Sequence, residues 1–185
     1  MIVIKENNRV YLFESVYTYG DAGRWDQALV PENMPLFKAA KANVLIGGDS
    51  FYELEAIRYL HLPFPATLNA PQLSEKVLPK LKSALKRLDK LDEDGDVSYM
   101  VFAKGDRAFM LTSNFALAEI EKEKAFGWQA ERLRYALLTT QGQPMMERVK
   151  HIYQSLGRQL RANTFPLIMA DSKSMQVKII REEEI

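Results

Sequence analysis

The pattern of apolar and polar positions begins with two apolar runs. Residues 1–5 are β-branched and apolar apart from Lys5, and residues 9–13 are apolar again, with alternation. Between them lies Glu6-Asn7-Asn8, which has the chemistry of a tight turn. Two such runs across an Asn-Asn turn predict a β-hairpin. Because its first strand begins at residue 1, we expect the amino end to be held in a sheet.

The pattern changes from strand to helix between residues 43 and 61. Residues 43–46 predict a short apolar strand, the pair Gly47-Gly48 follows it, and a helix then begins after Asp49-Ser50. Either Asp49 or Ser50 has a side chain that can cap free N–H groups at the start of this helix. We expect the helix to end at His61.

A long helix is expected over residues 71–91. Its apolar positions recur at helical spacing, and Pro79 should kink or split it. The other faces are basic, with Lys76, Lys80, Lys82, Lys86, Arg87 and Lys90. A solvated helix face is the interpretation we favour over a site for an anionic partner.

The second half of the chain repeats the order of strands followed by helices. Residues 97–104 and 107–112 predict a hairpin across Gly105-Asp106, and residues 116–126 could add short strands. Helices are expected over 128–140 and from Pro144 onward, and a last hairpin joins 165–170 to 175–180. The buried stripe expected on the fourth helix is Met146, Val149, Tyr153, Leu156 and Leu160.

Helices therefore come in consecutive pairs between antiparallel hairpins. This order argues against a doubly wound parallel sheet, in which strands and helices alternate singly. It predicts an α+β fold, a four-layer αββα sandwich of two antiparallel sheets between two helical layers. The length of 185 residues favours a single domain over 1–185.

Composition excludes several classes of function. The chain has 25 basic and 24 acidic residues, so no global field would attract nucleic acid or an anionic membrane. It has no cysteine and only two histidines, His61 and His151, so we expect neither a metal site nor a cofactor. No apolar run is long enough to span a bilayer, and residues 1–5 do not form a secretory signal. We expect a cytoplasmic protein.

The element order and three short segments resemble the N-terminal-nucleophile hydrolases, in particular the proteasome β-subunit and its bacterial relative HslV. The first segments are Asn33-Met34-Pro35-Leu36-Phe37 and Val44-Leu45-Ile46-Gly47-Gly48-Asp49 before a helix. The third is Lys124-Ala125-Phe126-Gly127-Trp128, which is similar to the family's glycine-containing strand-to-helix junction. The resemblance implies an amidase or peptidase that attacks with the hydroxyl of an N-terminal threonine, whose own amine serves as base.

The chain departs from that pattern at the residues that matter for chemistry. Its first residues are Met1 and Ile2, and the hairpin register puts the threonine position ahead of residue 1. By the resemblance, the supporting aspartate falls near Glu14 and Ser15. The supporting lysine falls near Asn33-Met34, where the nearest lysine in sequence is Lys38, and Trp128 replaces a serine. Our candidate site residues are therefore Glu14, Ser15 and Lys38.

Three functions remain open. The first is a catalytically degenerate proteasome-like protein that acts by assembly, with itself as partner. The second is a hydrolase with a non-standard nucleophile, for which Ser15, Thr18 and Ser50 are candidates by chemistry alone. The third is a module that binds a small molecule or peptide through the aromatic loop from Tyr17 to Trp25. Because no N-terminal nucleophile is present, we favour the first.

Overall fold

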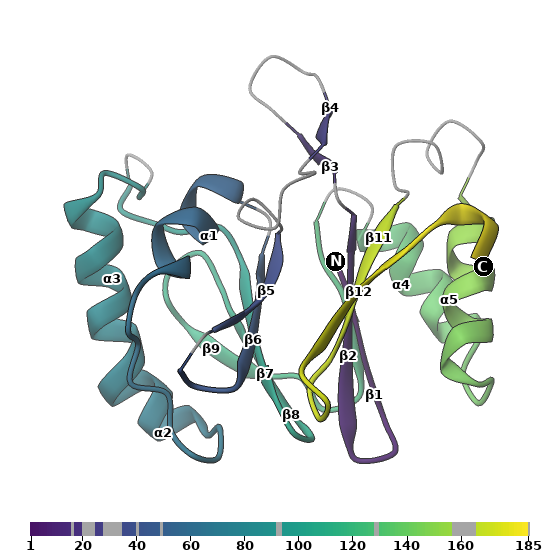
Figure 1. Ribbon diagram of the computed structural model, residues 1–185, viewed down its shortest axis with the longest axis horizontal. Helices are drawn as coiled ribbons and strands as arrows, with labels where there is room; N and C mark the ends of the chain where they lie inside the picture. Colours follow the sequence, from purple (N-terminus) through teal and green to yellow (C-terminus); the bar gives the residue numbers. More distant parts are fainter. Residues whose placement is uncertain are drawn as a thin grey trace.

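The computed structural model describes residues 1–15, 17–19, 25–27, 35–39, 41–48, 50–91, 94–127, 130–156 and 166–184. For residues 17–19, 25–27, 51 and 52 it describes the backbone only. The expected four-layer αββα sandwich is confirmed (Figure 1). Two five-stranded antiparallel sheets lie face to face, with α1 to α3 outside one sheet and α4 and α5 outside the other.

The first sheet contains both the amino-terminal and the carboxy-terminal hairpins. Its order is β10-β1-β2-β11-β12. The strands are β1 (Ile2–Glu6), β2 (Arg9–Ser15), β10 (Glu123–Ala125), β11 (Leu167–Asp171) and β12 (Gln176–Ile180). The turn of the first hairpin is made by Asn7 and Asn8, both at positive φ (53° and 59°), a conformation that asparagine tolerates well. The predicted hairpins at both ends of the chain are confirmed.

The second sheet has the order β5-β6-β7-β8-β9. Its strands are β5 (Leu36–Ala39), β6 (Val44–Gly48), β7 (Met100–Lys104), β8 (Arg107–Leu111) and β9 (Leu117–Glu119). The predicted short strands after residue 116 are present, but they belong to different sheets, since β9 pairs with β8 and β10 pairs with β1. A separate two-stranded ribbon is formed by β3 (Tyr17–Tyr19) and β4 (Trp25–Gln27).

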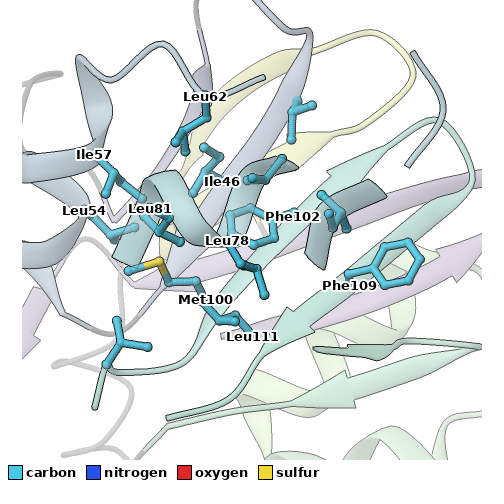
Figure 2. Packing of buried hydrophobic residues seen from close by; sticks show 14 of the residues in the cluster. Ile46, Leu54, Ile57, Leu62, Leu78, Leu81, Met100, Phe102, Phe109 and Leu111 are labelled. Atoms are coloured by element: carbon cyan, nitrogen blue, oxygen red, sulfur yellow. The ribbon is translucent and has the colours of Figure 1, made fainter. Parts of the chain in front are cut away.

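The helical layer over the second sheet contains α1 (Phe51–Arg58), α2 (Ala70–Gln72), a π-helical turn (Leu73–Val77) and α3 (Leu78–Arg87). The Ser50 side chain caps α1 as expected, and the helix ends at Arg58, before His61. Pro79 lies in the first turn of α3, and the π-helical turn runs directly into it, so the predicted kink or split near Pro79 is a local change of helix type in a continuous helical segment. Figure 2 shows Leu78 and Leu81 of α3 packed with Ile46, Met100 and Phe102 of the sheet.

The layer over the first sheet contains α4 (Ala130–Thr139) and α5 (Met145–Gln154). A short 3-10 helix (Glu182–Glu184) follows β12. The stripe prediction is correct for Val149, Tyr153 and Leu156, which are buried, and wrong for Met146, which is 39% exposed; Leu160 lies outside the described residues. Met145 and Ile152 pack against the core instead, so Met146 lies at the edge of the buried stripe.

Between the sheets lies a third apolar layer. It joins the inward sides of β1, β2 and β11 to those of β5, β6, β7 and β8, and Met1 belongs to it. The predicted glycine pair ends β6, and a Cβ on Gly48 would come within 2.9 Å of the Tyr99 backbone oxygen. The glycine therefore allows β6 and the chain before β7 to approach each other closely.

Candidate functional site

The backbone nitrogen of Met1 is the centre of the candidate site. This amine donates a hydrogen bond to the Phe126 carbonyl (3.0 Å), and it lies 3.0 Å from Glu14 Oε2. Phe126 in turn donates from its own N–H to the Met1 carbonyl (2.9 Å). Residue 1 is thus held on one side by β2 and on the other by the residue after β10, both of which flank β1 in the first sheet.

Glu14 lies next to this amine near the end of β2. Its second oxygen accepts the backbone N–H of Ser15 (2.9 Å), and its side chain is 14% exposed. The charge of Glu14 also reaches Tyr153 of α5. Burial, and then the negative charge of Glu14, raise the pKa of the Tyr153 phenol well above its ordinary value. The site therefore combines an amine, a carboxylate and a buried neutral phenol.

The Met1 side chain lies between the two sheets. It is 6% exposed, and it contacts Gly47 at the end of β6. A Cβ added at Gly47 would lie 2.5 Å from Met1 Cε and 3.2 Å from Leu36 Cδ1. Gly47 therefore leaves the space that the Met1 thioether occupies. A thioether carries no proton to lose and is a weak acceptor, so it cannot be an activated nucleophile.

Of the three candidate residues predicted from the sequence, Glu14 contacts the Met1 amine, Ser15 is its neighbour in β2, and Lys38 lies on the other sheet. Glu14 is at the Met1 amine, and Ser15 follows it in β2, paired with Leu167 of β11. Lys38 is exposed on β5, two residues beyond the Leu36 that approaches Gly47. The threonine position was expected ahead of residue 1, but it is residue 1 itself that lies at the Glu14 carboxylate.

The other nucleophile candidates have structural roles or lie outside the described part of the chain. Ser50 Oγ accepts the Glu53 N–H at the start of α1 (3.3 Å). Thr18 is described by its backbone only, and so are Tyr17 and Trp25 of the aromatic loop. Asn33, Met34 and Trp128 are outside the described residues.

Neither histidine lies in the candidate site as the structure describes it. His61 is exposed in the segment between α1 and α2. His151 is exposed on α5, with Nδ1 2.8 Å from Gln143 Oε1. Within the described ranges, no three His, Asp or Glu side chains come together as a metal site would need.

The sequence did not predict the contacts of the Met1 amine with Phe126 or of its thioether with Gly47. Met1 and Phe126 are 125 residues apart, and the register that joins β10 to β1 has no local signal. The glycine pair at the end of β6 was the sequence feature that could have indicated the contact with Met1, because glycine in a strand often marks the close approach of another group.

The described surface includes two hollows that Met1 does not line. One, of about 580 Å³, is lined by residues of the loop before α2 and by Lys76. The other, of about 400 Å³, is lined by Glu123, Lys124, Arg134, Leu137 and Leu138 beside α4.

Large apolar side chains are exposed on α4, beside the second hollow. Tyr135 is 72% and Leu138 58% exposed, and the two lie three positions apart on the helix. We call Tyr135 and Leu138 the α4 patch. None of the helices in the described ranges has the length and apolar character needed to cross a bilayer.

No protein-family model matches the sequence, and no curated protein is significantly similar to it. Solved structures, in contrast, match nearly the whole chain. Thiobacillus denitrificans BPH has a TM-score of 0.71 at 15% identity, covering 95% of this chain and 97% of that one. Anbu (ancestral beta-subunit) from Yersinia bercovieri has a TM-score of 0.64 at 11% identity, with coverages of 99% and 87%. Eukaryotic HslV from Trypanosoma brucei has a TM-score of 0.54 at 10% identity, with coverages of 98% and 98%.

These likenesses define the class of fold. The chain has the N-terminal-nucleophile-type fold of proteasome-like and HslV-like proteins, as the element order predicted. At identities of 10–15% they establish the fold alone.

Proposed function

We propose that this protein is a non-hydrolytic subunit with a proteasome-like fold and that it acts by assembling with copies of itself. The observation that carries the first part is Met1. Its thioether fills the space beside Gly47, and its amine is bonded to Glu14 and Phe126. An N-terminal nucleophile needs a hydroxyl or thiol on the residue that attacks. The Met1 side chain has neither.

A labelling experiment tests the absence of a nucleophile. The purified protein is incubated with a β-lactone and separately with epoxomicin, with which Thiobacillus denitrificans BPH has been solved in complex. Intact mass spectrometry should show a chain that starts at Met1 and carries no adduct. That relative, treated in parallel, is the positive control.

Two results would contradict this part of the proposal. One is a protein, isolated from its natural source, whose first residue is a serine, threonine or cysteine instead of Met1. The other is a covalent adduct on the chain. In that case the variants Ser15→Ala and Ser50→Ala would show which of the two serines carries the adduct. Loss of the adduct in Ser15→Ala, with Lys38→Ala and Glu14→Gln lowering its rate, would favour the hydrolase hypothesis.

The assembly part is supported by the α4 patch. Monomeric proteins rarely gather exposed apolar side chains on one surface, and tyrosine is enriched where proteins meet. The Yersinia bercovieri neighbour is described as an ancestral beta-subunit, and a second copy of the same chain is the commonest partner of such a surface. We further propose that residues 1–185 work as one domain in the cytoplasm.

Sedimentation velocity over a range of concentrations tests assembly. The wild-type protein should sediment as an oligomer, and Tyr135→Glu/Leu138→Glu should weaken association by about tenfold or more, because each buried anchor contributes more than about 1 kcal/mol. Tyr59→Glu is the matched control, since Tyr59 is similarly exposed (71%) on the opposite helical layer. A wild-type protein that stays monomeric at every concentration would overturn the assembly proposal.

A further inference from the structure

The helix α3 has two chemically different sides. One side buries Leu78, Leu81, Ala84 and Leu85 on the second sheet (Figure 2). The outward side carries exposed cations on α3 and on the π-helical turn before it: Lys76, Lys80, Lys86 and Arg87, which we call the basic face. Because residues 76, 80 and 87 differ by four and then seven positions, they share one ridge of a helix.

The cations of the basic face have no carboxylate partner in the described part of the chain. The ion pairs of Met1, Arg9, Arg107 and Arg148 lie elsewhere in the fold and involve none of the four residues of the basic face. Lys82, one turn away, is already used, since its Nζ lies 4.8 Å from the Phe115 ring centroid. The basic face is therefore positive charge that the protomer itself does not neutralise.

The complementary charge lies in the 3-10 helix after β12. Glu182, Glu183 and Glu184 are successive carboxylates on a solvent-exposed segment, and Glu184 Oε2 accepts the Arg181 N–H (2.7 Å), which fixes the turn. We call these three residues the acidic segment.

The two surfaces lie at opposite ends of the molecule. Figure 1 has the longest axis horizontal, and α3 lies at one end while the carboxy-terminal residues lie at the other. All four layers separate them, so the basic face of one protomer cannot meet its own acidic segment. Any contact between them needs a second copy of the chain.

We propose that the basic face docks the acidic segment of a second copy, in a head-to-tail contact. This inference rests on the self-association part of the proposed function and uses a surface other than the α4 patch. Each protomer offers both halves of the contact, so the contact is heterologous and repeats from copy to copy until a ring closes or a filament grows. Opposite charges of this kind favour encounter and fix orientation, and their effect falls with salt.

A nucleic acid is the competing occupant of a basic helix face. It is less favoured, because the formal net charge of the chain is only +1 and Glu75 and Asp89 border the basic face at its two ends. The experiment below separates the two occupants.

Charge reversal tests the contact on the full chain. Variant one is Lys80→Glu/Arg87→Glu, and variant two is Glu183→Lys/Glu184→Lys. Each variant alone should associate at least about tenfold more weakly than wild type in about 50 mM salt, and the wild type should lose a similar factor in about 500 mM salt. An equimolar mixture of the variants should regain association, because each reversed surface then meets a complementary one. Lys41→Glu/Lys173→Glu, which reverses two other exposed charges, is the control and should behave as wild type.

Each outcome has a defined consequence. Association that is insensitive to salt and to both variants overturns this contact while leaving assembly through the α4 patch intact. A mixture that stays dissociated likewise overturns it. Binding of a fluorescent single-stranded RNA that variant one abolishes, without any change in self-association, would assign the basic face to nucleic acid instead. A strict monomer under all conditions would remove the assembly proposal itself.

Discussion

The two halves of the sandwich are held together by different kinds of interaction. The first sheet, with α4 and α5, contains the ion pairs of Met1, Arg9 and Arg148, each with at least one partner that is 10% exposed or less. The Arg107–Glu119 pair in the second sheet has both side chains about one-third exposed. The second sheet and α1 to α3 are instead joined by a larger apolar cluster.

The difference in interactions suggests that the position of the elements is fixed more strictly in one half than in the other. Apolar packing stabilises a layer but tolerates small shifts of one element over another, whereas a buried charge pair needs one geometry. The polar half contains residue 1 and the carboxylate beside it. We infer that its buried charges serve to fix the position of the amino end more than to add stability.

The largest expected effect concerns Arg148, which joins α5 to α4 and β10. Its guanidinium bonds the Glu123 carboxylate and the Leu137 carbonyl (2.9 Å), and its side chain is 8% exposed. Arg148→Ala should lower the free energy of unfolding by about 3–5 kcal/mol, because Glu123 is left without its cation. Urea denaturation measures this. Arg132→Ala, an exposed position on α4, should change stability by less than about 0.5 kcal/mol.

The corresponding test in the apolar half is Leu81→Ala. Leu81 is fully buried between α3 and the second sheet, so the variant leaves a cavity and should cost about 2–4 kcal/mol. Leu88→Ala, at a 42% exposed position just after the same helix, is the control and should cost far less. Equal losses in the two variants would show that α3 is not anchored by its inward side.

Two adjacent glycines of β6 contact different halves of the sandwich: Gly47 faces Met1 of the first half, and Gly48 faces Tyr99 and Leu54 of the second. A Cβ on Gly48 would meet a backbone oxygen, that of Tyr99, at 2.9 Å, whereas on Gly47 it would meet the flexible end of Met1. Gly48→Ala should therefore cost about 1–3 kcal/mol, and Gly47→Ala should cost less because Met1 can move. A thermal shift assay ranks the two. A larger loss for Gly47→Ala would mean that the Met1 side chain is rigidly held.

The smallest expected effect depends on pH and concerns Asp171 at the end of β11. Burial of this carboxyl opposes ionisation. Hydrogen bonds from the Lys173 backbone and from Ser174, with the charge of Arg9, outweigh it and lower the pKa below its ordinary value of 3.8. A lowered pKa in the folded state means stability that is present above pH 3.8 and is lost as the pH falls through the folded value.

Asp171→Asn should remove that contribution. At neutral pH the variant should be about 1–2 kcal/mol less stable than wild type, and the difference should shrink toward pH 3. Urea titrations at several pH values check this. A difference that grows on acidification would contradict the assignment.

Much of the architecture could be predicted from the sequence. The apolar runs at residues 1–5 and 9–13, with the turn Asn7-Asn8 between them, predicted the first hairpin. Helical spacing predicted a helix over residues 71–91, and α3 ends at Arg87. Local turn and capping chemistry was sufficient there, as the Ser50 cap of α1 shows. The apolar period failed for Met146, because the adjacent Met145 fits the same period and is the one that packs against the core.

Pairing across the fold was decided only by the tertiary structure. Nothing near residues 117–125 shows that β9 joins one sheet and β10 the other, which is what brings Phe126 to Met1. Likewise, the sequence showed that residue 1 carries no hydroxyl, but only the packed sheets show its thioether against Gly47 and its amine against Glu14. The physical reason is the distance along the sequence over which each kind of interaction acts. Side-chain period and turn chemistry act over a few residues, whereas the contacts of this site join strands far apart in sequence, and only the collapse of the two sheets selects them.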